Sequence, residues 1–309
     1  MTTALITHLA CLEHMMPSGH PESPDRLRRV LAALEGPEFA DLLREQAPQA
    51  TMAQLALAHS EGFAEALLAR LPEQGFAFID GDTPVSPGSG EAALRGAGAV
   101  VRAVDMVMQG VARNAFCAVR PPGHHAESNR AMGFCLFNNV AVGALWARYK
   151  WKCARIAVVD FDVHHGNGTQ EMFENDPELF YASTHQAPFY PGTGNANETG
   201  VAGNVVNASL QAGSGSDAFQ AVMSGRIFSA LDAFRPDLIL ISAGFDAHMQ
   251  DPLANLWLEE EDFAWATREI MAIAVKHCAG RVVSALEGGY DLTALAQSVQ
   301  AHVRALMGE

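Results

Sequence analysis

The chain has 309 residues, of which 49% are hydrophobic and 18% charged, so it is long enough to bury the core of a large α/β domain. Its formal net charge of -15 disfavours direct binding of nucleic acid, and no apolar run is long enough to span a membrane. Residues 1–16 lack the basic start of a signal peptide, and the five cysteines include no Cys-x-x-Cys pair. These features predict a cytoplasmic protein with free thiols.

Apolar spacing predicts alternating strands and helices along the chain. A strand is expected at residues 4–7, and Ser23-Pro24 begins a helix that stops at Gly36. A second helix is expected within residues 37–46 and a third from Ser60. Further helices are expected over 91–109, after Phe137 through Tyr149, and over 217–234, 259–279 and 291–307. Further strands are expected over 115–119, from 158, and over 178–183, 204–210, 237–242 and 281–285.

Residues 75–90 are rich in Gly, Pro, Ser and Asp and predict a long surface loop. Because strands alternate with helices through the rest of the chain, we expect an α/β fold with a mostly parallel sheet covered on both faces. No linker interrupts this pattern, so a single domain over residues 1–309 is expected.

The polar residues in and after the strand that begins at Val158 are the strongest candidates for a metal site. A period of two sends Asp160, Asp162 and His164 to one side. Buried carboxylates are costly unless a cation or a donor compensates them, and Asp162 with His164 suits a zinc-like ion. An acidic strand end followed by a helix capped by Asn167, or by the threonine two residues on, explains the same stretch about equally well.

Three other strand ends carry unusual residues, namely His124-His125, Gly244–Asp246 and Glu287–Tyr290. The carboxyl ends of parallel strands share one edge of the sheet, so these loops are expected to meet at one crevice. Asp246 would then be the third ligand beside Asp162 and His164. Three ligands without cysteine leave a position for a water, which is the arrangement of a catalytic metal site.

Proton transfer at such a site would fall to His124 and His125, with Asp160 and Asn167 as their orienting partners. Tyr290 could donate a hydrogen bond to a developing oxyanion. Each feature also has a plain structural explanation: a chance histidine pair, a capping aspartate, or a Gly-Gly turn around a buried ring. Five other histidines are expected to be ordinary surface or helix residues: His8, His14, His59, His277 and His302.

Taken together, the motifs resemble the histone deacetylase superfamily, on the side of its class II and bacterial deacetylase-like members. The matching stretches are His20–Glu22, Arg120–Glu127, Gly133–Asn139, Asp160–Gly168, Gly244–Asp246 and Glu287–Tyr290. The resemblance implies an arginase-like α/β fold with a parallel sheet of about eight strands. It also implies hydrolysis of an N-acyl amide to acetate and an amine.

By this resemblance Asp162, His164 and Asp246 bind zinc, with iron(II) as the alternative metal. Tyr290 polarises the substrate carbonyl together with the metal. His124 and His125 share the general base and acid roles, with His125 favoured as the base.

Further positions carry over by local alignment. Gly133, Phe134 and Tyr190 match the narrow channel for an acyl-lysine, and Asp82 matches a rim position that binds the substrate backbone. Arg26 matches an arginine near an internal acetate exit. The remaining matches are to a structural potassium site, formed by Ser183 and Thr184 with Asp160, Asp162 and His164.

Departures from the class I pattern at Asn167 and Glu287 place the chain nearer class II. Leu253 stands where polyamine-selective relatives carry an acidic residue, so acetyl-lysine is favoured over acetylpolyamine as the substrate. We therefore expect a zinc-dependent deacetylase acting on an acyl-lysine peptide, an acyl-lysine protein or an acetylated small amine, and the sequence allows a homo-oligomer. The alternatives are an acetylpolyamine amidohydrolase, a non-catalytic acyl-lysine binder and an arginase-type ureohydrolase, although the last prefers a metal pair.

Overall fold

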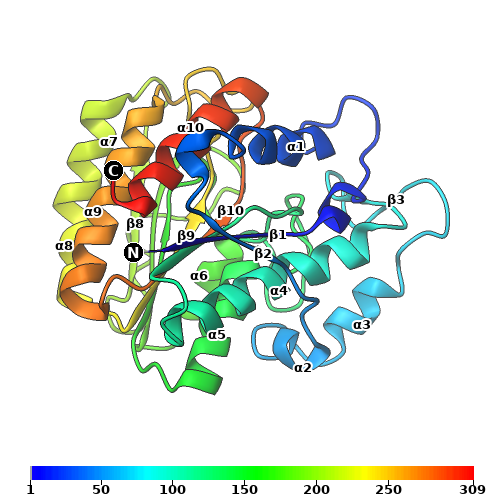
Figure 1. Ribbon diagram of the computed structural model, residues 1–309, viewed down its shortest axis with the longest axis horizontal. Helices are drawn as coiled ribbons and strands as arrows, with labels where there is room; N and C mark the ends of the chain where they lie inside the picture. The colour runs from blue at the N-terminus through cyan, green and yellow to red at the C-terminus, as the bar shows by residue number, and fades with distance from the viewer. Residues whose placement is uncertain (1) are drawn as a thin grey trace.

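Eight parallel strands run side by side through the middle of the computed structural model, which describes residues 2–309 (Figure 1). Their order is β2-β1-β5-β10-β9-β6-β7-β8, and every neighbouring pair is parallel. The predicted α/β fold with about eight mostly parallel strands is confirmed. The strands are β1 (Thr3–Thr7), β2 (Leu43–Gln46), β5 (Asn114–Cys117), β6 (Ile156–Asp160), β7 (Leu179–Gln186), β8 (Val205–Leu210), β9 (Leu238–Ala243) and β10 (Val282–Leu286).

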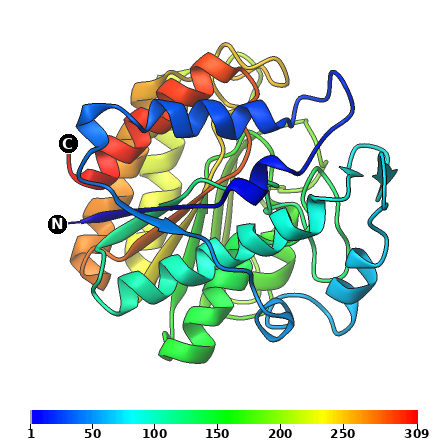
Figure 2. The same ribbon diagram turned by 45° about the vertical axis from the view of Figure 1, so that its right-hand side comes forward.

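Helices cover both faces of this sheet, as Figures 1 and 2 show. One layer consists of α1 (Pro24–Ala33), α7 (Ser216–Val222), the π-helical η3 (Met223–Phe228), α8 (Ser229–Phe234), α9 (Glu260–Cys278) and α10 (Leu292–Met307). The other consists of α4 (Ser89–Met108), α5 (Asn139–Trp151) and α6 (Asn167–Phe173). Strands buried on both faces need apolar residues throughout, which is why β9 reads Leu-Ile-Leu-Ile-Ser-Ala.

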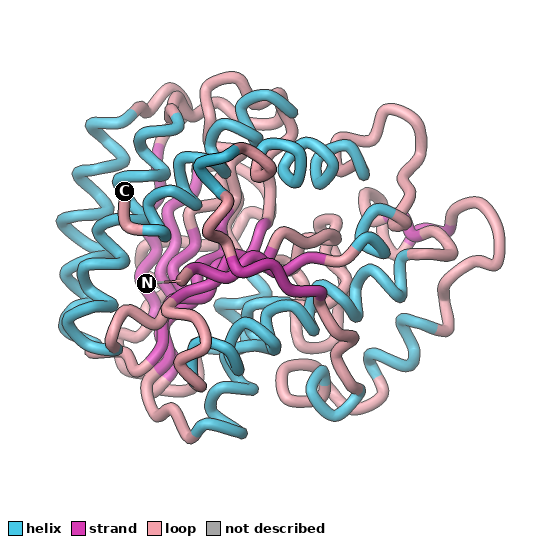
Figure 3. The backbone as a smooth tube through the Cα atoms, in the orientation of Figure 1, coloured by secondary structure: helices cyan, strands magenta, loops and turns pink. Residues whose placement is uncertain are grey.

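Six shorter elements complete the structure, and all of them except η2, which lies near α10, are toward the right of Figure 1. They are η1 (Leu9–Leu12), η2 (Pro37–Phe39), α2 (Met52–Leu55), α3 (Phe63–Leu68), β3 (Ala77–Phe78) and β4 (Pro84–Val85). The stretch predicted as a surface loop, residues 75–90, contains the antiparallel β3–β4 pair. Figure 3 shows how much of this side of the molecule is loop.

The helix predicted within residues 37–46 is wrong. The stretch forms the short η2 and then β2, whose residues 43–46 pair with β1 at the edge of the sheet. A ten-residue window is marginal for a helix, because nucleation is costly and tertiary contacts decide the outcome. Here the open edge of β1 offered backbone hydrogen bonds that the local sequence pattern does not reveal.

The five cysteines are buried and unpaired within the part of the chain that the structure describes. None of the helices in residues 2–309 combines the length and the apolar character needed to cross a membrane.

Three histidines expected to be ordinary surface or helix residues, His14, His59 and His302, are buried. His302 does lie on a helix, α10, but the helical period turns it inward. Its ring nitrogens lie 2.6 Å from the Thr267 hydroxyl and 2.9 Å from the Ser284 hydroxyl, which replace water. Burial lowers the pKa of His302 to about 3.

The buried His302 predicts a stability change in acid. Its folded pKa of about 3 lies below its ordinary value of 6.5, so the unfolded chain binds the proton first and stability falls as the pH drops below 6.5. Between about pH 7 and about pH 5 this one group costs roughly 2 kcal/mol. Urea unfolding of wild type and His302→Gln over this range should show a shallower loss in the variant. Equal losses of unfolding free energy in wild type and in His302→Gln would contradict this account.

Candidate active site

The four strand ends singled out from the sequence do meet at one edge of the sheet. The strands β5, β10, β9 and β6 are consecutive neighbours, and all four point the same way. Their carboxyl ends therefore deliver the His124-His125 turn, the Glu287–Tyr290 turn, Asp246 and the segment after Asp160 to a common place.

Asp162, His164 and Asp246 form a group whose candidate ligand atoms all lie within 4.8 Å of one another. The Nδ1 atom of His164 is 3.0 Å from Asp162 Oδ1 and 3.1 Å from Asp246 Oδ2. Strand β6 ends at Asp160, so the alternation predicted for Asp160, Asp162 and His164 does not hold. The loop after the strand brings the residues together instead.

This group fits a divalent metal ion by the chemistry of its donors. Two buried carboxylates lie beside one imidazole, so they need a compensating positive charge. Against the effect of burial, the same two carboxylates raise the pKa of His164 to about 10, because they favour a cation between them. One nitrogen and two oxygen donors without cysteine are typical of a catalytic site with an open position.

Backbone groups and two glycines orient the carboxylates. The backbone N–H of Gly288 donates to Asp162 Oδ2 at 2.8 Å, and that of Val163 donates to Asp246 Oδ1 at 2.9 Å. A Cβ atom at Gly244 would overlap the Asp162 carboxylate, and one at Gly288 would overlap the Asp246 carboxylate. Glycine is thus required here by the close approach of a side chain.

The two adjacent histidines have different partners. His124 Nδ1 lies 2.9 Å from the carboxylate of Asp160, and His125 Nδ1 lies 2.9 Å from the amide oxygen of Asn167. Burial opposes protonation of His124, but Asp160 and then Asp162 outweigh it and raise its pKa well above the usual value. Burial and the neighbouring charge of His124 lower the pKa of His125 well below it. The two rings therefore differ in basicity.

Two residues that hold the histidine pair in place, Tyr181 and Glu287, were not predicted to do so from the sequence. The Tyr181 hydroxyl donates to Asp160 Oδ2 at 3.1 Å. Glu287, noted only as a class II feature, accepts the backbone N–H groups of Gly123 at 2.6 Å and His124 at 3.2 Å. Burial raises the pKa of Glu287 to about 7. A glutamate directly after an apolar strand was the available clue.

Tyr290 lies on the same edge, partly buried, with its ring 6.0 Å from that of Phe134. The Arg26 guanidinium lies 4.8 Å above the Tyr290 ring. Burial raises the pKa of the Tyr290 hydroxyl well above its usual value; Arg26 opposes this, and Asp246 adds to it. The hydroxyl thus keeps its proton and can donate a hydrogen bond.

The residues expected to form a channel lie close to the histidine pair. The Tyr190 ring meets the His125 ring edge to face at 5.1 Å. Gly133 has a φ of +57°, and a Cβ atom there would press on the His125 ring and approach the Tyr190 hydroxyl. Asp82 is exposed, and the Thr83 hydroxyl that donates to its carboxylate at 3.1 Å also accepts the backbone N–H of Phe134 at 3.2 Å. Sequence reasoning missed Phe189, which stacks on His164 at 5.1 Å.

Three further residues named from the sequence are Leu253, Ser183 and Thr184. Leu253 is half-buried in the loop that follows Asp246, and its backbone N–H donates to Asp251. Ser183 pairs in register with Asp160 across β6 and β7, and both Ser183 and the adjacent Thr184 are buried. The Ser183 hydroxyl lies 2.9 Å from His185 Nδ1. The potassium assignment of Ser183 and Thr184 stays a prediction.

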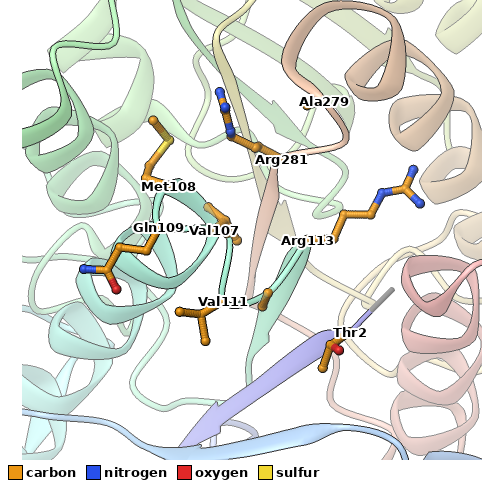
Figure 4. Close-up of a pocket in the computed structure, with 10 residues that line it drawn as sticks. Thr2, Val107, Met108, Gln109, Val111, Arg113, Ala279 and Arg281 are labelled. Carbon is orange, nitrogen blue, oxygen red and sulfur yellow. The ribbon is translucent and has the colours of Figure 1, made fainter.

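A separate cavity of about 420 Å³ opens at the other end of the sheet (Figure 4). It includes Arg113 and Arg281, which directly precede β5 and β10. Their guanidinium groups point away from each other in Figure 4, so these two charged groups do not converge as the polar groups of the site above do.

Comparisons with known proteins agree with this geometry. The family model of the histone deacetylase domain matches residues 20–306. A histone deacetylase-like amidohydrolase of Pseudomonas aeruginosa is 38% identical over 89% of this chain and 73% of its own length. Type-2 histone deacetylase 2 of Dictyostelium discoideum is 36% identical over 99% of this chain, which spans 21% of that longer protein. The crystal structure of the HDA15 HD domain superposes with a TM-score of 0.94 at 34% identity, covering 100% of this chain and 88% of that one.

The Glu287 contacts predict a measurable loss of stability. In Glu287→Ala the buried N–H groups of Gly123 and His124 lose their acceptor, which should cost about 1–3 kcal/mol. Glu287→Gln is the matched control, because an amide oxygen can still accept these bonds, and it should lie close to wild type. Urea unfolding measures both, and equal losses in the two variants would contradict the role assigned to the carboxylate.

Proposed function

Because the chain belongs to the histone deacetylase family, we propose that it hydrolyses acetyl-lysine in peptides or proteins with the help of a bound zinc ion. The chain is a hydrolase, as its deacetylase and amidohydrolase relatives are named. The observation that carries the proposal is the group Asp162, His164 and Asp246, whose two carboxylates are buried, with the histidine pair beside it.

Asp162, His164 and Asp246 would hold the metal, and their oxygen and nitrogen donors suit zinc, with iron(II) as the alternative. When bound, such an ion supplies Lewis acidity toward a carbonyl oxygen and lowers the pKa of a coordinated water. The protein holds the carboxylates in place beforehand, through the backbone N–H groups of Val163 and Gly288.

His125 serves as the general base. Its Nδ1–H donates to Asn167 Oδ1, so the lone pair of Nε2 is free to accept a proton from the attacking water. Burial and His124 lower the pKa of His125, which keeps it neutral and ready. His124 carries its proton beside Asp160, stabilises the developing negative charge and supplies the proton for the leaving amine.

Tyr290 donates its hydroxyl proton in a hydrogen bond to the carbonyl oxygen as negative charge develops there. Its raised pKa ensures that the hydroxyl is protonated at neutral pH. Gly289, with a φ of +118°, lets the turn bring the tyrosine in at this angle.

The surroundings of the site favour an acyl-lysine substrate. The aromatic walls Phe134 and Tyr190 suit a straight aliphatic chain, and Asp82 at the rim can accept N–H groups of a peptide backbone. Leu253 offers no charge to a second ammonium group, which disfavours acetylpolyamines. The buried, unpaired cysteines are consistent with a reducing compartment such as the cytoplasm.

Metal removal tests the proposed reaction. Exhaustive chelation should abolish cleavage of a fluorogenic acetyl-lysine peptide, and added zinc should restore it, since the bound ion would supply the Lewis acid and lower the pKa of the attacking water. A parallel assay on acetylputrescine should give the lower rate. Undiminished activity after chelation would refute metal dependence, whereas peptide binding without acetate release would point to a non-catalytic binder.

Removing one hydroxyl tests Tyr290. Tyr290→Phe should lower kcat about 100- to 1000-fold, because the oxyanion loses a preorganised donor. Tyr149→Phe removes the hydroxyl of a tyrosine that is 61% exposed on α5 and should leave kcat unchanged. Steady-state kinetics on one acetyl-lysine peptide compares the three proteins, and a Tyr290→Phe enzyme with the wild-type kcat would exclude this role.

A further inference from the structure

Asp251 lies in the loop between β9 and α9, five residues after Asp246, and has no part in the reaction described above. The side chain is buried, with 7% of the residue exposed. Its Oδ2 accepts the backbone N–H of Tyr290 at 2.7 Å, while its Oδ1 accepts the backbone N–H of Leu253 at 3.0 Å. One carboxylate therefore closes the local turn to Leu253, two residues on, and also binds the distant backbone of Tyr290.

These bonds are not needed to cap the helix that follows Tyr290. Helix α10 has its own cap, Asp291, whose Oδ1 accepts the N–H groups of Thr293 at 3.0 Å and Ala294 at 2.9 Å. The N–H of Asp291 itself lies 3.4 Å from Asp251 Oδ2, so the shorter bond of Asp251 goes to the tyrosine.

The turn that Asp251 helps to hold has a sequence that does not itself fix the backbone. Tyr290 follows Gly288 and Gly289, which place few limits on the chain direction. Arg26 holds the carbonyl side of the turn through Gly289 O at 2.6 Å and Glu287 O at 2.5 Å. Asp251 holds the amide side, so the turn is fixed from both directions.

We propose that Asp251 is a positioning residue that places the Tyr290 hydroxyl and joins the tyrosine turn to the loop that carries Leu253. The two segments then keep one relative position, and a bound substrate would meet a tyrosine already in place. The kinetic part of this inference rests on the proposed deacetylase function, but the backbone contacts do not.

Asparagine is not a neutral replacement here. Asp251 presents an oxygen to each segment, whereas the amide of Asp251→Asn presents one oxygen and one NH2 group. One backbone N–H must then face another donor. The variant should release either the Tyr290 turn or the Leu253 segment while changing almost no volume.

The amide of Tyr290 reports on the contact directly. The chain has four tyrosines, so protein labelled with ¹⁵N-tyrosine gives four backbone amide signals, and Tyr290→Phe identifies the one that matters. In wild type this signal should be shifted downfield and protected from hydrogen exchange, as expected for a donor to a buried carboxylate. In Asp251→Asn it should move or lose protection. Rapid exchange of the Tyr290 amide in wild type would overturn the proposal without any variant.

Kinetics tests the consequence for the reaction. Asp251→Asn should lower kcat about 10- to 100-fold, since a small misplacement of a catalytic group is that costly, with a smaller change in KM. Asp291→Asn, which removes a neighbouring charge but keeps a capping oxygen for α10 and the bond from Tyr290 to Asp251, is the matched control and should retain most of kcat. Equal kcat values for Asp251→Asn and wild type would overturn the proposal. If wild type cleaves no acyl amide, the proposed function fails, and the labelled amide alone decides the role of Asp251.

Discussion

The site depends on keeping two carboxylates, Asp162 and Asp246, buried beside each other and beside one imidazole. Like charges in a poorly solvated place repel, so the arrangement persists only if a cation balances it and the surrounding groups hold the oxygens still. Backbone N–H groups from Val163 and Gly288 do the holding, and glycine at position 244 leaves room for one carboxylate. Much of the local sequence follows from this requirement.

A second set of buried charges fixes the segments around the first. Arg120, three residues after β5, donates to both oxygens of Glu22, and Arg26 donates to Glu22 Oε1 at 3.1 Å. All three residues are fully buried. Because Arg26 also holds the carbonyls of the Tyr290 turn, this network connects the start of α1 with the histidine turn and the tyrosine turn. Removing one partner would leave an uncompensated charge inside the protein, which makes such a network costly to break.

The sequence predicted those parts of the structure that have a regular spacing. Alternating apolar runs identified the parallel sheet, and polar residues at four strand ends identified the crevice. The β2 strand was mistaken for a helix because its partner, β1, lies about forty residues away in the chain. The buried His302 was missed because the hydroxyl groups that satisfy it, Thr267 and Ser284, come from other elements. The structural roles of Asp251 and Glu287 were not predicted for a similar reason, because a carboxylate that binds backbone N–H groups produces no spacing pattern in the sequence.

The histidine pair shows how the fold separates the roles of two neighbouring, chemically identical residues. His124 and His125 differ by one position, so their side chains leave the turn in different directions and meet different partners. A carboxylate meets the first and an uncharged amide meets the second. The first ring is then stabilised as a cation, and its charge in turn makes protonation of the second less favourable. A proton donor and a proton acceptor thus arise side by side from one dipeptide, and the difference between them comes from Asp160 at the end of β6 and Asn167 at the start of α6.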